Sequence, residues 1–189
     1  MRSRDIPNLI TLLRFALVPP FMLVLVKERF ADALWLFVIA GVSDALDGFL
    51  AKRYAWTSRL GSILDPLADK ALLVSAYLAL GWLGLLPAWL VAGVIGRDVV
   101  IILGAVLYHL LVGRFHLAPS RLSKLNTLCQ IVLVLAVIVD HSLLRLGPGL
   151  IQLLILLTAT TTLASGAHYI WTWGARAAQE RREKAGGYS

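Results

Sequence analysis

Long apolar runs alternate with short polar segments along the whole chain. A membrane-spanning helix needs roughly 17–25 predominantly apolar residues, and six runs are of about that length. They are Ile6–Val26, Ala33–Leu50, Ile63–Leu83, Pro87–Val112, Leu125–Leu144 and Leu150–Trp173. The pattern predicts an all-α polytopic membrane protein with six transmembrane helices. We expect a single membrane domain over residues 1–174 and a short basic cytoplasmic tail, frayed, over residues 175–189.

The first apolar run could be a secretory signal, because the basic residues Arg2 and Arg4 precede it. Against this, Arg14 interrupts the run, Pro19 and Pro20 follow in it, and no small-residue cleavage site comes after. We therefore expect this run to remain as a helix of the mature protein.

Composition and charge agree with a membrane protein and give it an orientation. Hydrophobic residues make up 59% of the chain and charged residues 15%, against roughly half and a quarter in soluble proteins. Only Lys27, Arg29 and Arg145 fall on one side of the six-span arrangement. The other side holds Arg2, Arg4, Lys52, Arg53, Arg59, Arg114, Arg121, Lys124, Arg176, Arg181, Arg182 and Lys184. The positive-inside rule then places both termini in the cytosol, and we expect the inner membrane of a bacterium.

The net charge and the cysteine content exclude other classes of protein. The charge of +7 is explained by topology and by attraction to anionic lipid head groups, so we expect no nucleic-acid partner. Cys129 is the only cysteine of the chain. An intramolecular disulfide or a zinc site built of thiolates is therefore excluded.

Four aspartates stand out at the junction of the second and third runs. Asp44 and Asp47 are three residues apart and Asp65 and Asp69 four apart, so each pair shares one face of a helix. At about 1.5 Å per residue, both pairs lie within the last or first two turns of their spans, at one depth near the cytoplasmic surface. Carboxylates in an apolar setting need a compensating charge to stay ionised. The spacing predicts a site for one or two divalent metal ions, open to the cytosol and the inner leaflet.

Small and basic residues accompany these acids. Gly48, Ala51 and Gly61 leave space for a ligand beside the backbone, and Lys52 and Arg53 follow at the membrane surface. Ordinary helix-end charges would explain one or two of the aspartates. They explain poorly why all four lie at matched depth among small residues.

The motif Asp44-x-x-Asp47-Gly48-x-x-Ala51-Lys52, then eight residues, then Gly61-x-x-x-Asp65-x-x-x-Asp69 resembles that of the CDP-alcohol phosphatidyltransferases, with every spacing kept. One position departs from the family pattern, because Lys52 stands where arginine is usual and replaces a planar two-pronged grip by a point charge. Arg53 is the alternative there. The resemblance extends to Ile6-Pro7-Asn8 with Arg14, Asp65-Pro66-Leu67-Ala68-Asp69-Lys70, Gly96-Arg97-Asp98 and Ser123-Lys124-Leu125-Asn126-Thr127.

This resemblance implies an enzyme of phospholipid biosynthesis that attacks CDP-diacylglycerol with an alcohol and releases CMP. All four aspartates would be metal ligands for two Mg²⁺ or Mn²⁺ ions, and Asp69 would also take the proton of the acceptor hydroxyl. Arg14 and Asn8 would either close the nucleotide site or pack in the bundle. The cytidine and diphosphate site would be lined by Gly48, Ala51, Gly61 and by Lys52 or Arg53.

Arg97 and Lys124 are the candidates to bind a phosphorylated acceptor. Arg97 could instead pair with Asp98. Lys124 could instead be only one of the cytoplasmic basic residues that orient the protein in the membrane. The resemblance leaves glycerol 3-phosphate and phosphatidylglycerol open as acceptors. Arg97-Asp98 and Asn126 are more similar to the cardiolipin synthases of the family, whereas chains of this size more often resemble its phosphatidylglycerophosphate synthases. Transfer to another alcohol is a further alternative.

Two other classes of protein compete with this interpretation. A small divalent-cation transporter would place its acids near the bilayer midplane, with a route to both sides. A catalytically dead lipid-binding scaffold would not need all four aspartates. We therefore expect a membrane enzyme that works among membrane lipids as a homodimer.

Overall fold

The computed structural model describes residues 6–54, 61–112 and 120–186, with side chains for residues 12–44, 67–104 and 120–172. These ranges contain six α-helices and no strand, which confirms the all-α prediction. The helices are α1 (Ile6–Val26), α2 (Phe30–Tyr54), α3 (Gly61–Trp82), α4 (Ala88–Val112), α5 (Arg121–Ser142) and α6 (Pro148–Gly186). Each helix overlaps one of the six predicted apolar runs over most of the length of that run. The prediction of a frayed tail after Gly174 is wrong, since α6 continues as a helix up to Gly186.

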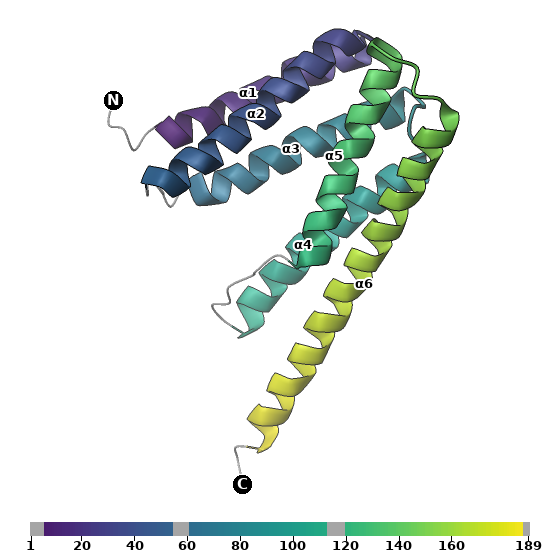
Figure 1. The fold of residues 1–189 in the computed structure, drawn as a ribbon. Helices are drawn as coiled ribbons and strands as arrows, with labels where there is room; N and C mark the ends of the chain where they lie inside the picture. Colours follow the sequence, from purple (N-terminus) through teal and green to yellow (C-terminus); the bar gives the residue numbers. More distant parts are fainter. Residues whose placement is uncertain (1–5, 55–60, 113–119, 187–189) are drawn as a thin grey trace.

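The helices form two groups joined by α5 (Figure 1). In the first group, α1 packs against both α2 and α3. In the second group, α6 packs against α4 and α5, and its C-terminal part extends past the other helices toward the C-terminus. Because α5 also contacts α2 and α3, it places the α2–α3 pair beside the α4–α6 pair. This arrangement brings the motif residues Asp44 of α2 and Asp69 of α3 close to Thr127 of α5, and it brings Lys70 of α3 to Asp98 of α4.

The hydrophobic core lies where the first group meets α4 and α5. Its fully buried side chains come from α1 to α5 and from the α3–α4 turn, and include Phe21, Leu25, Tyr77, Leu80, Leu86, Leu133 and Ile138. The Tyr77 hydroxyl donates a hydrogen bond to the Gln130 carbonyl at 3.4 Å, which ties α3 to α5 within this core.

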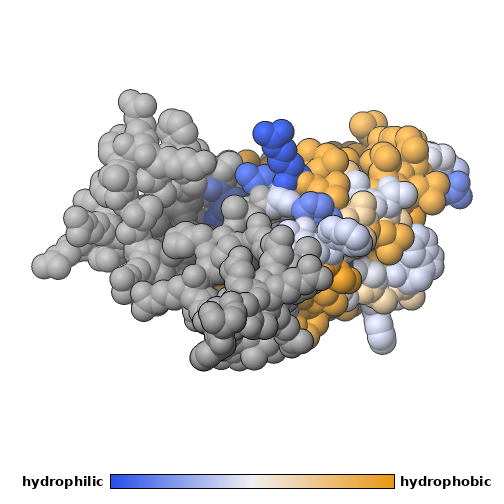
Figure 2. Space-filling view, turned by 90° about the horizontal axis from the view of Figure 1, so that it is seen from below, coloured by the Kyte–Doolittle hydropathy of each residue, from blue (hydrophilic) through white to orange (hydrophobic). Residues whose placement is uncertain are grey.

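In the described part of the chain, several polar side chains are buried and many apolar side chains are exposed. Arg14, Arg97, Asp98 and Asn126 are buried, whereas apolar side chains such as Trp82 (83% exposed) face outward. Figure 2 shows large hydrophobic areas on the described surface seen from below. Such apolar surface is rare on soluble monomers and is typical of a protein surrounded by lipid or by a partner.

Two helical segments among the described residues are long and apolar enough to cross a membrane. They are Arg121–Ser142, which is α5, and Pro148–Thr172, which is the first part of α6. The remaining spans of the six-span arrangement stay predictions.

Candidate active site

Arg14 of α1 brings together two of the four motif aspartates. Its Nη1 donates a hydrogen bond of 2.7 Å to Asp69 Oδ1 on α3. Its Nη2 lies 2.9 Å from Asp44 Oδ1 on α2, in an ion pair without hydrogen-bond geometry. The Arg14 side chain is only 1% exposed. A buried guanidinium needs charged partners, and because α1 packs against both α2 and α3, it finds one carboxylate on each.

The two carboxylates face a cavity of about 410 Å³, here called the acidic cavity. The side chain of Asp44 is 45% exposed and that of Asp69 47%, so both remain open to a ligand. The buried guanidinium of Arg14 supplies one positive charge between the two carboxylates. Apolar residues supply most of the remaining wall, and the lining includes Arg14, Phe37, Asp44, Asp69, Lys70 and Thr127.

The other residues of the predicted donor and metal site lie outside the described side chains. Asp47, Gly48, Ala51, Lys52 and Arg53 belong to α2, and Gly61 and Asp65 to α3, but only their helical backbone is described. Within the described side chains, no three acidic, histidine or cysteine residues gather at one place. The metal site of four aspartates therefore stays a prediction, of which the structure places Asp44 and Asp69.

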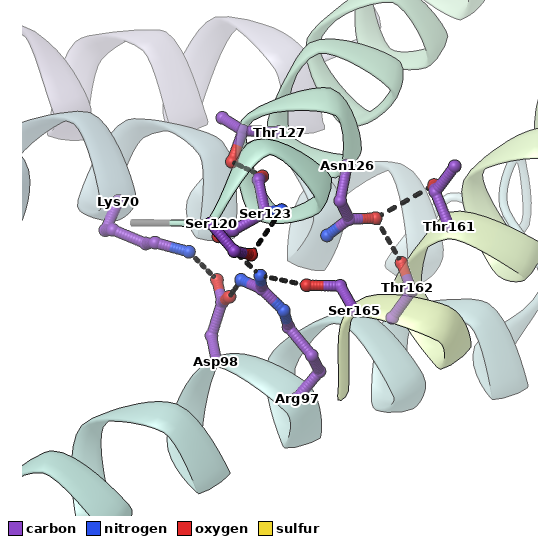
Figure 3. Close-up of polar contacts among 10 residues, drawn as sticks. All are labelled: Lys70, Arg97, Asp98, Ser120, Ser123, Asn126, Thr127, Thr161, Thr162 and Ser165. Atoms are coloured by element: carbon purple, nitrogen blue, oxygen red, sulfur yellow. Dashed lines mark hydrogen bonds and ion pairs between the residues drawn. The ribbon is translucent and has the colours of Figure 1, made fainter. Parts of the chain in front are cut away.

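Arg97 is at the centre of a second polar site, formed where α4, α5 and α6 meet (Figure 3). Its side chain is 5% exposed, and its Nη1 donates to Asp98 Oδ1 at 2.7 Å. Its Nη2 donates to Ser123 Oγ at 2.7 Å and to Ser165 Oγ at 2.5 Å. The guanidinium carbon also lies 5.8 Å from the centre of the Tyr169 ring. The pairing of Arg97 with Asp98, considered as an alternative from the sequence, is thus present.

A neighbouring polar contact holds α5 against α6. Asn126 Oδ1 accepts hydrogen bonds from Thr161 Oγ1 at 3.0 Å and from Thr162 Oγ1 at 2.9 Å. Asn126 and Thr162 are both buried. Since Ser123 and Ser165 belong to the same two helices, this contact helps to fix the hydroxyl groups that hold Arg97.

A cavity of about 440 Å³, here called the cationic cavity, opens beside Arg97. Its polar lining residues are Lys70, Arg97, Asp98, Ser123, Lys124 and Thr127, with Tyr169, Ile101 and Ile102 completing the wall. The structure therefore brings Arg97 and Lys124, the two candidates for acceptor binding, to one cavity. Lys70 and Thr127 also line the acidic cavity, so the two cavities adjoin.

Sequence reasoning left the role of Arg14 open and assigned none to Lys70. The signal for Arg14 was present, because a lone arginine within an apolar run needs an acidic partner. The contact between Lys70 of α3 and Asp98 of α4 had no comparable signal, since 28 positions separate them in the sequence.

Fold and site together define an all-α protein with membrane-type helices, in which an acidic cavity adjoins a cationic one. The chain belongs to the CDP-alcohol phosphatidyltransferase family, whose model matches residues 4–168.

Curated relatives carry two kinds of name. The chain is 37% identical over 181 residues to the cardiolipin synthase (CMP-forming) of Rattus norvegicus, which covers 87% of this chain and 60% of the relative. It is 32% identical over 186 residues to the chloroplastic CDP-diacylglycerol–glycerol-3-phosphate 3-phosphatidyltransferase 1 of Oryza sativa, covering 89% and 56%. A probable phosphatidylglycerophosphate synthase of Mycobacterium tuberculosis is 30% identical over 178 residues, covering 89% and 81%. The chain thus spans about 60% of the length of the rat relative.

Proposed function

We propose that this chain transfers the phosphatidyl group of CDP-diacylglycerol to the hydroxyl of a glycerol-based acceptor and releases CMP. The observation that carries the proposal is the pair of adjoining cavities in a member of this family. One cavity presents the motif acids Asp44 and Asp69, and the other presents cationic side chains. A metal-bound diphosphate suits the first cavity, and an anionic acceptor suits the second.

The acidic cavity fits a divalent metal ion. Carboxylate oxygens are hard ligands that suit Mg²⁺ and Mn²⁺, and Asp44 and Asp69 keep nearly half of their side-chain surface exposed. We propose that these two, together with Asp47 and Asp65, hold two such ions. When bound, the ions would neutralise charge on the diphosphate oxygens and on the leaving CMP.

The remaining steps fall to side chains of this chain. Asp69 takes the proton of the acceptor hydroxyl. At the same time the oxygen of that hydroxyl attacks the phosphorus of the diacylglycerol phosphate. The new oxygen–phosphorus bond forms as the bond to the CMP phosphate oxygen breaks. Arg14 holds the carboxylate of Asp69 through Oδ1 and so fixes its orientation. We further propose that the cytidine and diphosphate groups lie against Gly48, Ala51 and Gly61, with Lys52 or Arg53 on the diphosphate.

Phosphatidylglycerol is the acceptor that the cationic cavity supports best. Ile101 and Ile102 give this cavity an apolar wall beside its cations, which suits an acceptor that carries both a phosphate and acyl chains. The name of the rat relative agrees with cardiolipin as the product. Glycerol 3-phosphate is the second candidate, because the rice and mycobacterial relatives are named for it or for its product.

Product identification tests this proposal. Purified protein in detergent with Mg²⁺ and CDP-diacylglycerol should form cardiolipin from phosphatidylglycerol, or phosphatidylglycerophosphate from glycerol 3-phosphate, as identified by lipid mass spectrometry. A new lipid from serine, inositol phosphate or choline instead would overturn the choice of a glycerol-based acceptor. No product with any of these alcohols would overturn the proposed enzyme activity.

We also propose that the chain spans the membrane six times as a homodimer, with both termini and the site on the cytosolic side. The one-sided distribution of basic residues supports this topology. With Cys129 replaced by alanine, a cysteine at Lys27 should react with a membrane-impermeant maleimide from outside intact cells. A cysteine at Arg59 should react only after permeabilisation, and the reverse pattern would contradict the orientation.

A further inference from the structure

Lys70 lies at the boundary between the acidic and cationic cavities. It follows Asp69 directly on α3, and among the described residues it lines both cavities together with Thr127 of α5. Its side chain is 34% exposed, whereas that of Arg97 is 5% exposed. Lys70 is therefore more accessible to an incoming anion than the buried arginine.

Asp98 draws the ammonium group of Lys70 toward the cationic cavity. Lys70 Nζ forms an ion pair with Asp98 Oδ2 across the gap between α3 and α4 (Figure 3). The Asp98 side chain is 6% exposed and lines the cationic cavity but not the acidic one. The Lys70 side chain thus runs along the boundary, and its charged end lies on the side of the proposed acceptor.

Arg97 is less accessible to a substrate than Lys70, because its side chain is almost fully buried and three of its N–H groups already donate within the protein. Its Nη2 directs its two hydrogens to Ser123 and Ser165, and its Nη1 donates to Asp98. The ammonium group of Lys70 has three donors, and Asp98 accounts for one of them. The set of Lys70, Asp98 and Arg97 carries a net charge of +1, which attracts an anion, and Lys70 is the more accessible of its two cations.

We propose that Lys70 binds the phosphate of the acceptor at the boundary of the two cavities, and that Asp98 is a positioning residue that holds Lys70 there. This inference rests on the proposed phosphatidyl transfer. Both candidate acceptors contain the required phosphate, one as a soluble monoester and the other as a lipid diester. A phosphate held at this boundary places the acceptor hydroxyl beside Asp69, the residue before Lys70. Arg97 then acts as the scaffold of the cavity, tied to α5 and α6 through its serine contacts.

Steady-state kinetics of Lys70→Met test the role of Lys70 directly. Loss of one hydrogen bond to a charged group costs about 1.5–3 kcal/mol, which corresponds to a rise of about 10- to 150-fold in the acceptor KM. The KM for CDP-diacylglycerol should change by less than about twofold, since the donor is proposed to bind in the acidic cavity. Lys70→Arg keeps the cation and should recover most of the loss.

The kinetics are measured with phosphatidylglycerol and with glycerol 3-phosphate, and the acceptor used by the wild type identifies the source of the phosphate. Lys27→Met is the matched control, because Lys27 is an exposed lysine between α1 and α2. It should change neither KM. Lys70→Gln is measured in parallel, so that one uncharged variant is available if the methionine variant does not fold. An unchanged acceptor KM in the folded variant overturns the inference.

A double variant tests the positioning role of Asp98. Asp98→Asn alone should raise the acceptor KM, because the ammonium is no longer held in place. In the Lys70→Met background the same change should add less than about twofold, because the ammonium that Asp98 holds is absent and the asparagine Oδ1 can still accept the hydrogen bond from Arg97 Nη1. If the fold-changes in acceptor KM of the two single variants multiplied in the double variant, Asp98 would act independently of Lys70. A wild type that transfers no phosphatidyl group would refute the proposed function, whereas an active wild type with an unaffected Lys70 variant would refute this inference alone.

Discussion

Replacing Asp69 by asparagine should lower turnover by about 10³-fold or more while leaving the binding of CDP-diacylglycerol largely intact. The asparagine amide keeps the size of the carboxyl group and can accept a hydrogen bond from Arg14, but it cannot take a proton. Loss of a general base typically costs about 10²–10⁴-fold in rate, and the loss of a proposed metal ligand adds to this. Turnover is measured as CMP release, and donor binding as the rise in Tm that CDP-diacylglycerol causes.

Asp32→Asn is the matched control for this experiment. Asp32 is a partly exposed aspartate that pairs with Arg29, 2.5 Å away, near the start of α2. Its replacement removes the same charge far along α2 from Asp44 and should leave turnover unchanged. If Asp69→Asn turned over at the wild-type rate, Asp69 would be neither the base nor a required metal ligand.

Replacing Arg14 by methionine should destabilise the protein by about 1–3 kcal/mol when metal is absent. Removing one partner of a fully buried ion pair costs about 3–5 kcal/mol. The cost here is smaller because Asp44 and Asp69 are each nearly half exposed, and water screens their repulsion. Added Mg²⁺ should raise the Tm of this variant more than that of the wild type, since a divalent cation restores the lost positive charge.

The Tm in detergent is measured with EDTA and again with Mg²⁺. Arg14→Lys should fall between the wild type and the methionine variant, because one ammonium replaces a guanidinium that contacts two carboxylates. Arg29→Met is the control, since Arg29 is 65% exposed and forms a surface pair worth little. Equal Tm values of the wild type and Arg14→Met in EDTA would mean that Arg14 does not hold the two acids together.

The sequence predicted the helices well because each apolar run must form its backbone hydrogen bonds within itself in a lipid environment. The bounds of α1 match the first run, Ile6–Val26, residue for residue. The continuation of α6 to Gly186 was missed because the length of an apolar run predicts only the membrane-spanning part of a helix. A helix can continue into polar sequence beyond that part. Residues 175–184 are rich in alanine, arginine, glutamine and glutamate, which favour helix without being apolar.

The contacts within the site could be predicted only in part. Spacing along one helix placed the aspartates on common faces, but it could not show which residue of another helix would meet them. The pairing of Arg14 with Asp44 and Asp69 depends on α1 packing against both α2 and α3. The hydrogen bond from Arg97 to Ser165 joins residues 68 positions apart. Such contacts follow from helix packing, which the apolar pattern leaves undetermined.

CMP release from CDP-diacylglycerol, measured with and without divalent metal, is the decisive test of the proposed phosphatidyl transfer. The purified protein should release CMP when supplied with Mg²⁺ or Mn²⁺ and phosphatidylglycerol or glycerol 3-phosphate. EDTA should abolish the release, and an excess of Mg²⁺ should restore it. Absence of metal-dependent CMP release with these acceptors, and with serine, inositol phosphate and choline, would contradict the claim that this chain is a phosphatidyltransferase.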